Sequence, residues 1–270
     1  MRQSLFPEPK PVIGVIHLGA LPGTPMSKLG IADLIDLALQ ETRLYQQGGV
    51  DALIIENTHD TPYLRGTAGA EIVAAMAVIG RAVKTEFKLP TGAQVLAGAN
   101  TQALAVAHAA GLDFIRAEGY AFAHVADEGL IEASAGELLR YRKLIGAERV
   151  EVWTDIKKKH SSHAITADIS LGEMAAAVEF MRGDAVIVTG SVTGEPPRLE
   201  DVREAKAHSG LPVLLGSGVS AANLADYYAL ADGFIIGSAF KTDGHWANGV
   251  ELARVRHLMD EARRLSALSQ

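Results

Sequence analysis

The chain has 270 residues, a net charge of −7 and a calculated pI of about 5.7. Nucleic-acid binders usually carry a basic excess, so this charge argues against a nucleic-acid partner and against an anionic membrane surface. The absence of cysteine excludes disulfides, thiolate catalysis and Cys-ligated metal centres. With 48% hydrophobic and 21% charged residues, the composition is that of a globular chain with a large core.

No targeting or membrane segment is evident. Residues 1–10 contain two prolines and no apolar core, which is unlike a signal peptide. The longest apolar stretch, residues 72–79, is far shorter than the roughly 20 residues of a membrane helix. We therefore expect a soluble, cytoplasmic protein with no integral membrane segment. Its oligomeric state stays open, a homo-oligomer included.

Short Val/Ile-rich runs alternate with helical patterns from one end of the chain to the other. The predicted strands are residues 12–18, 52–57, 91–95, 114–118, 150–157, 185–190, 212–217 and 233–238. The predicted helices are residues 31–47, 68–87, 101–110, 135–145, 171–181, 199–208, 221–230 and 250–267. This spacing is that of βα units. We predict a single (β/α)8 TIM-barrel domain over residues 1–270, with a short N-terminal extension over 1–10. A doubly wound open sheet is the alternative.

The predicted loops differ at the two ends of the barrel. Helix-to-strand links are short and share a Gly-x-Asp phrase, as in Gly49-Val50-Asp51 and Gly111-Leu112-Asp113. Strand-to-helix links are long and polar, over residues 18–30, 58–67, 119–134, 158–170 and 240–249. Barrel enzymes build their sites from the loops that follow the strands, so we expect the site at this face.

Polar side chains gather where the predicted strands end. Strand alternation places Arg116 and Glu118 on one face, and points Glu151, Trp153, Asp155 and Lys157 into the barrel. The first three strands end near His17, Glu56, Asn57 and Gln94. The alternative for Arg116 and Glu151 is a buried ion-pair layer. The residues that we expect to carry catalysis are His17, Glu56, Arg116, Glu118, Asp155, Lys159 and His160.

Strands seven and eight end in Gly216-Ser217-Gly218 and Gly237-Ser238. Glycine lets backbone N–H groups approach an anion closely, and barrels frequently hold a phosphate between these two loops. We predict a phosphate site there, widened by Thr189 and Gly190 within the segment 189–194, with Lys241 as its local positive charge. Such a barrel is similar to the ribulose-phosphate-binding barrels. The alternative is that these glycines serve only tight turns.

The loops also hold basic and aromatic side chains. Lys158 is interpreted as part of a solvated basic loop, whereas a lysine at the mouth could form a Schiff base, stabilise an enolate or hold a phosphate. His160 and His163 are three residues apart, as divalent-metal ligands could be, although no compact ligand motif is present. The loops after strands two and four also carry His59, Asp60, His124 and Asp127. Lid aromatics are predicted at Tyr63, Tyr120, Phe122 and Trp246, with loop packing as the alternative.

Taken together, these phrases resemble the BtpA/SgcQ family. The resemblance is carried by the segments 16–23, 49–57, 116–119, 155–160, 189–190, 216–218 and 237–241. It implies a TIM barrel. One family name comes from photosystem I biogenesis, and the other comes from a protein linked to sugar-utilisation genes. No reaction follows from the resemblance.

Three functions are consistent with the sequence. The first is an enzyme acting on a small phosphorylated metabolite, a sugar phosphate or a nucleotide-related compound, with isomerase or lyase chemistry by analogy of fold. The second is a non-catalytic photosystem I biogenesis or stability factor. The third is a flavin-binding barrel, because flavin barrels use a similar phosphate site. The cofactor itself is not specified by the sequence.

Overall fold

The computed structural model describes residues 5–6, 10–190 and 194–268. Eight parallel strands close into a barrel in the order β1-β11-β10-β9-β7-β4-β3-β2. They are β1 (Val12–His17), β2 (Ala52–Glu56), β3 (Thr91–Gln94), β4 (Phe114–Ala117), β7 (Glu151–Ile156), β9 (Ala185–Val188), β10 (Val213–Leu215) and β11 (Gly233–Ile236). The predicted (β/α)8 barrel is therefore confirmed, and the open sheet is excluded.

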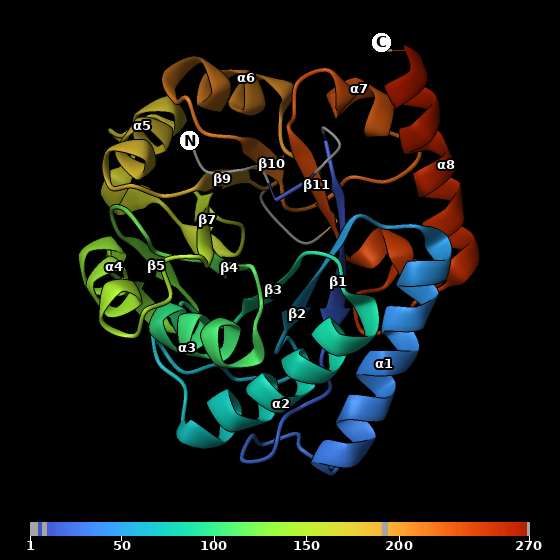
Figure 1. The fold of residues 1–270 in the computed structure, drawn as a ribbon. Helices are drawn as coiled ribbons and strands as arrows, with labels where there is room; N and C mark the ends of the chain where they lie inside the picture. The colour runs from blue at the N-terminus through green and yellow to red at the C-terminus, as the bar shows by residue number, and fades with distance from the viewer. Residues whose placement is uncertain (1–4, 7–9, 191–193, 269–270) are drawn as a thin grey trace.

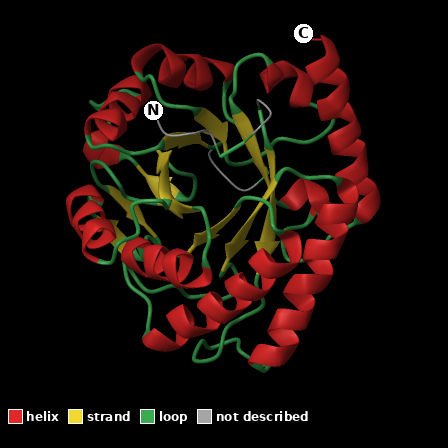
Figure 2. Cartoon of the chain, viewed as in Figure 1, coloured by secondary structure: helices red, strands yellow, loops and turns green. Residues whose placement is uncertain are grey.

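Helices form a ring outside these strands (Figures 1 and 2). They are α1 (Ile31–Gly48), α2 (Ala70–Phe87), α3 (Asn100–Ala110), α4 (Ala135–Leu144), α5 (Leu171–Phe180), α6 (Leu199–His208), α7 (Leu224–Tyr228) and α8 (Leu252–Leu268). Their ends follow local chemistry. Ser170 and Glu173 form a capping box at the start of α5. Gly49, at φ 83°, ends α1 in the left-handed conformation that glycine adopts without strain.

The aspartate of the Gly-x-Asp phrase joins neighbouring strands at the bottom of the barrel. The Asp51 carboxylate accepts the Val12 N–H at 2.8 Å, and the Asp51 N–H donates to the Val12 carbonyl at 3.0 Å. The same reciprocal pair occurs at Asp113 with Thr91, at Asp184 with Val152 and at Asp232 with Val213. Each aspartate thus satisfies backbone groups at the start of an adjacent strand and fixes the strand register.

The barrel interior is apolar toward the amino ends of the strands and polar at their carboxyl ends, where the long loops lie. Phe114 and Trp153 stack there with ring centroids 3.7 Å apart, among Ile13, Ile54 and Ile187. Phe6, from the N-terminal segment, lies against Trp153 at 6.0 Å, and the Trp153 indole donates to Glu151. A second apolar layer fills the space between strands and helices. The charged side chains Glu56, Arg116, Glu118 and Asp155 lie at the end where the long loops are, whereas Glu151 lies at the opposite end of β7.

The loops after β4 and β7 contain structure that the sequence pattern did not predict. They form a three-stranded antiparallel sheet of β6 (Gly129–Ile131), β5 (His124–Ala126) and β8 (Ser161–Ser162). Strands of two or three residues are too short to show alternation. Two boundaries also need correction. The helix predicted over 221–230 begins only at Leu224, and β7 ends at Ile156, so Lys157 does not belong to the inward-facing row. Within the described residues, no helix is long and apolar enough to cross a membrane.

Candidate functional site

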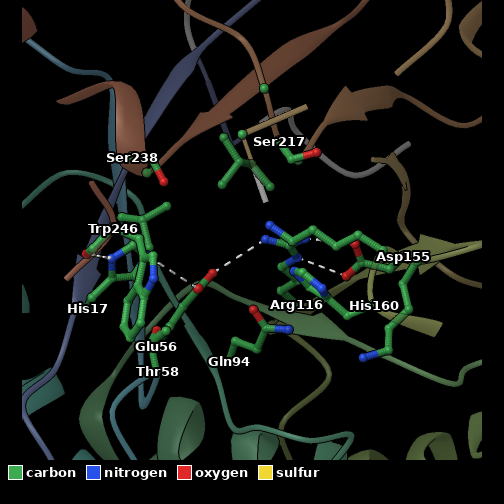
Figure 3. Close-up of a pocket in the computed structure, with 18 of the residues that line it drawn as sticks. His17, Glu56, Thr58, Gln94, Arg116, Asp155, His160, Ser217, Ser238 and Trp246 are labelled. Carbon is green, nitrogen blue, oxygen red and sulfur yellow. Dashed lines mark hydrogen bonds and ion pairs between the residues drawn. The ribbon is translucent and has the colours of Figure 1, made fainter. Parts of the chain in front are cut away.

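A cavity of about 780 Å³ opens at the carboxyl ends of the strands. All the side chains predicted to carry catalysis line it: His17, Glu56, Arg116, Glu118, Asp155, Lys159 and His160. The loops after β10 and β11 line the same cavity with Gly216, Ser217, Gly218, Gly237 and Ser238, whereas Thr189 and Gly190 do not. Figure 3 shows Arg116 between Glu56 and Asp155, with Ser217 and Ser238 across the cavity.

Arg116 lies at the centre of the cavity floor and is almost fully buried. Its Nε and Nη2 each donate to one oxygen of Asp155 at 2.8 Å, and its Nη1 lies 3.4 Å from Glu56 Oε1 (Figure 3). Burial alone opposes the charge on Arg116, but Asp155 and Glu56 outweigh it and raise the pKa of Arg116 above its usual value. Arg116 is therefore a fixed cation, and Asp155 holds it in place.

Two of the glutamates that line the cavity, Glu56 and Glu118, are buried and have raised pKa values. Glu118 accepts from Lys158 Nζ and from Gln94 Nε2, both at 3.3 Å. Burial raises the pKa of Glu118 and of Glu56, and nearby cations offset part of that effect. A carboxyl group with a raised pKa in a cavity is suited to general acid–base chemistry. Lys158 is half-buried and paired, so its interpretation as a solvated loop residue was wrong.

His17 ends β1 and presents one ring nitrogen to the cavity. Its Nδ1 lies 2.8 Å from the Trp246 carbonyl oxygen, which can only accept, so Nδ1 carries the proton and Nε2 carries a lone pair. Nε2 lies 4.0 Å from Glu56 Oε2. Burial and then the charge of Lys241 lower the pKa of His17 to about 3. At neutral pH His17 is therefore an uncharged hydrogen-bond acceptor beside Glu56.

Several polar groups of the loops after β9 and β10 already bond to other protein groups. The Gly190 N–H donates to Ser217 Oγ at 2.9 Å, and the Ser217 hydroxyl donates to the Glu195 carbonyl at 3.2 Å. Thr189 Oγ1 accepts the Lys159 N–H at 3.0 Å. Thr189, Gly190 and the Ser217 hydroxyl therefore hold the loops together and are not available to an anion. Residues 191–193 of the predicted segment lie outside the described residues.

Other donors of the two loops remain available. Within the described residues, the N–H groups of Gly218, Val219, Ser238 and Ala239 donate to no protein acceptor, unlike those of Phe240 and Lys241, which donate to Gly237 and Ser238. All four residues line the cavity. Oriented backbone N–H groups of this kind make an anion-binding concavity.

Lys241 does not lie at this concavity. Its amine is buried and bonds both oxygens of Glu41 at 2.7 and 2.9 Å. Glu41 lies on α1 and also accepts the Val250 N–H at 3.2 Å. The predicted role of Lys241 as the cation of the phosphate site was therefore wrong: the helix that follows the first long loop supplies a carboxylate that the local sequence could not reveal.

The metal expectation gains no support from the geometry. Within the described residues, no group of three or more His, Asp or Glu side chains is arranged to hold a metal ion. His163 Nε2 donates to the Lys158 carbonyl at 3.0 Å, and its ring lies 5.6 Å from that of His124. His160 lies apart on the exposed rim of the cavity.

The loop aromatics divide into two groups. Trp246 and Tyr63 line the cavity, as predicted for lid residues, and the Tyr63 hydroxyl donates to the Thr58 carbonyl. Tyr120 is buried in the outer core and donates to the Met181 carbonyl, and Phe122 packs partly buried at the same core, so both follow the loop-packing alternative. The sequence analysis missed Thr58 and Asn223 as lining residues, because isolated polar residues in loops carry no periodic signal.

Comparison with known proteins shows to which family the chain belongs. The model of the BtpA family matches residues 8–264. The chain belongs to the BtpA family. It is 45% identical to an uncharacterized mitochondrial protein of Caenorhabditis elegans, over 94% of this chain and 93% of that one. It is 34% identical to the photosystem I biogenesis protein BtpA of Synechocystis, over 93% of this chain and 87% of that one.

Solved structures with the same fold belong to other barrels. KGPDC from Streptococcus mutans matches with a TM-score of 0.60 at 13% identity, over 96% of this chain and 99% of that one. N-(5'-phosphoribosyl)anthranilate isomerase from Pyrococcus furiosus matches with a TM-score of 0.59 at 11% identity, over 94% and 99%. At these identities the BtpA-family chain shares with them the fold alone.

Proposed function

We propose that this protein is an enzyme that acts on a small phosphorylated metabolite, a sugar phosphate or a nucleotide-related compound. One observation carries the proposal: the N–H groups of Gly218, Val219, Ser238 and Ala239, which have no acceptor among the described residues, line the same cavity as the buried side chains of Arg116, Glu118 and Glu56. The first set suits a phosphate group, and the second suits proton transfer on the rest of the molecule.

The chemistry that the residues support is of the isomerase or lyase class. Glu118 and Glu56 are the candidate proton donors and acceptors, because burial raises the pKa of each carboxyl group. Arg116 and Lys159 would stabilise negative charge that develops on a substrate oxygen. Asp155, which holds two guanidinium nitrogens, positions Arg116. The phosphate would bind across the cavity, near Ser238 and His17.

Ligand-induced stabilisation tests the phosphate site. Ribose 5-phosphate and inorganic phosphate should raise the unfolding temperature, and ribose alone should not. Ser238→Ala should weaken phosphate binding by about 10-fold, since a hydrogen bond to a charged group is worth roughly 1.5–3 kcal/mol. Ser266→Ala, on α8 away from the cavity, is the control. If no phosphorylated compound stabilises the protein, the proposal fails. A screen of phosphorylated metabolites by the same measurement would identify the substrate class.

The name of the Synechocystis relative favours a second candidate, a non-catalytic factor in photosystem I biogenesis. The two candidates differ in their need for the cavity. Synechocystis deprived of its BtpA can be supplied with this chain or with its Ser238→Glu variant, which places a negative charge at the proposed phosphate site. Equal restoration of photosystem I by both would support the non-catalytic role, whereas restoration by the unaltered chain alone would support a role for the cavity.

The location of the protein in the cell is part of the proposal. The absence of cysteine is consistent with the reducing cytoplasm, whereas the name of the nematode relative places that protein in mitochondria. Fractionation of the source cells, with the protein detected by antibody, distinguishes the two locations.

A further inference from the structure

Cationic side chains at the barrel mouth differ in one respect, which is whether a carboxylate neutralises them. Arg116 bonds Asp155 at 2.8 Å, Lys158 lies 3.3 Å from Glu118, and Lys241 lies 2.7 Å from Glu41. The Lys159 amine makes no ion pair and donates no hydrogen bond to any described residue, although Lys159 lines the cavity. A partly buried ammonium without a partner is costly, so this amine calls for a different explanation.

The backbone around Lys159 holds it at the cavity. Lys157 and His160, on either side of the pair Lys158–Lys159, both adopt positive φ, at 42° and 54°. The Lys159 N–H donates to Thr189 Oγ1 at 3.0 Å, which joins the loop after β7 to the end of β9. The backbone of Lys159 is therefore held at the cavity wall, and its side chain lines the cavity.

The surroundings make the charged form of the Lys159 amine less favourable than it is in water. Burial, and then the fixed positive charge of Arg116, lower the pKa of Lys159. Glu56, Asp155 and Glu118 act in the opposite direction from a distance, and Arg116 and Lys158 already neutralise much of their charge. An uncharged lysine amine is a nucleophile, and desolvation beside another cation is one way in which proteins activate it.

We propose that the Lys159 amine forms an imine with the aldehyde or keto group of the substrate. That this substrate also carries a phosphate group rests on the proposed function. The substrate class is thereby narrowed to phosphorylated carbonyl compounds, and the chemistry to bond making or breaking next to the carbonyl carbon, because a protonated imine accepts the electron pair released there.

Groups that line the cavity can supply and accept every proton that imine formation requires. Lys159 Nζ adds to the carbonyl carbon, and a proton passes from nitrogen to the former carbonyl oxygen to give a carbinolamine. A proton from the Glu56 carboxyl group then lets this oxygen leave as water, which leaves a protonated imine and the Glu56 carboxylate. Hydrolysis by the reverse sequence frees the amine.

The rival explanation is that Lys159 serves only as a counter-ion for the phosphate. Two aldehydes separate the explanations: pyridoxal 5'-phosphate carries both a phosphate and an aldehyde, and pyridoxal carries the aldehyde alone. The intact protein is incubated with each at neutral pH, reduced with borohydride, digested and analysed by peptide mass. Labelling rates are compared between Lys159 and Lys157, its neighbour in the same loop, which does not line the cavity.

If the proposal is right, both aldehydes label Lys159 at least about 10-fold faster than Lys157, because a desolvated lysine amine beside another cation is the activated nucleophile. Lys159→Arg, which keeps the positive charge, should abolish the fast labelling while the unfolding temperature stays unchanged. Lys157→Arg should leave the fast labelling intact. The midpoint of the pH–rate profile at Lys159 should lie below the usual pKa of a lysine amine, about 10.4.

Each pattern of labelling has one meaning. Faster labelling by pyridoxal 5'-phosphate than by pyridoxal, slowed by inorganic phosphate, supports both the imine and the phosphate site. Equal rates with no effect of phosphate support the nucleophile and contradict the phosphate site. Labelling of Lys159 by pyridoxal 5'-phosphate alone supports the phosphate site but contradicts an amine activated by its surroundings, because the bound phosphate then accounts by proximity for the imine that borohydride traps. Preference for Lys159 with neither aldehyde overturns the imine proposal, and the phosphate site is then judged by the Ser238 variant.

Discussion

Asp155 holds Arg116 by two hydrogen bonds of 2.8 Å, one to Nε and one to Nη2, at the centre of the barrel mouth. The two residues lie on neighbouring strands, β7 and β4, and both side chains are almost fully buried. The sequence analysis kept a buried ion-pair layer as its alternative for Arg116 and Glu151. Arg116 does form a buried ion pair, but with Asp155, and this pair also forms the floor of the cavity. A structural and a functional role are thus combined in one contact.

Asp155→Ala should lower the free energy of unfolding by about 3–5 kcal/mol, because it leaves the buried guanidinium without its main partner. The control is Asp260→Ala, which removes an exposed pair with Arg263 and should cost less than about 1 kcal/mol. Denaturant unfolding measures both. Equal losses in the two variants would show that burial does not govern the Arg116–Asp155 pair.

Acid should destabilise the protein partly through His17. The pKa of His17 is lowered in the folded state to about 3, against about 6.5 in the unfolded chain. Between these values the unfolded chain binds more protons, so the contribution of His17 to the free energy of unfolding falls by about 1.4 kcal/mol per pH unit as the pH decreases. His17→Gln should lose this part of the slope between pH 6 and 4.

The matched control for His17 is His257→Gln, on the exposed face of α8. The pH dependence of stability is measured for both variants and for the unaltered protein. If His17→Gln retains the full slope, the imidazole of His17 is not held uncharged in the fold.

Gly218 should be far less tolerant of a side chain than another glycine of the same backbone conformation. Gly218 and Gly146 adopt φ of 69° and 71°. A Cβ at Gly218 would lie 2.1 Å from Pro196 N, whereas a Cβ at Gly146 would meet nothing within 4 Å. Gly218→Ala should therefore cost about 1–3 kcal/mol more than Gly146→Ala, the range for overpacking. Equal costs would show that the loop of residues 195–196 moves away freely. For the same reason, Gly218 is unsuited to testing the phosphate site.

Lys241→Met should lower stability by about 3 kcal/mol or more, because it leaves Glu41 partly buried without its partner. It should leave the affinity for inorganic phosphate within a factor of two, in contrast to Ser238→Ala. Thermal unfolding with and without phosphate measures both effects. A large loss of phosphate affinity in Lys241→Met would restore Lys241 to the phosphate site.

The fold was predictable because its signals are repeated. Each βα unit carries its own apolar strand, and the Gly-x-Asp phrase marks the start of several strands, where the aspartate bonds the backbone of a neighbour. The cavity side chains were predictable because strand alternation and strand ends fix their direction, as for Arg116, Glu118 and Asp155.

What could not be predicted depends on contacts distant in sequence. Lys241 is neutralised by Glu41, 200 residues earlier, and nothing near Lys241 indicates this partner. Likewise, Ser217 and Gly190 bond each other across two loops, so a Gly-Ser phrase that looked free is occupied. Lys158 and Lys159 are adjacent in one basic run, and only their placement shows that the first is paired, whereas the amine of the second has no partner among the residues that the structure describes.

A structure of the protein crystallised with ribose 5-phosphate tests the central claim most directly. We predict that the phosphate group lies within hydrogen-bond distance of the Ser238 and Ala239 N–H groups, facing Gly218 and Val219, with the sugar directed toward Glu56 and Lys159. A phosphate bound on the outer surface of the barrel, or a cavity without ligand at concentrations that saturate binding in solution, would contradict the account.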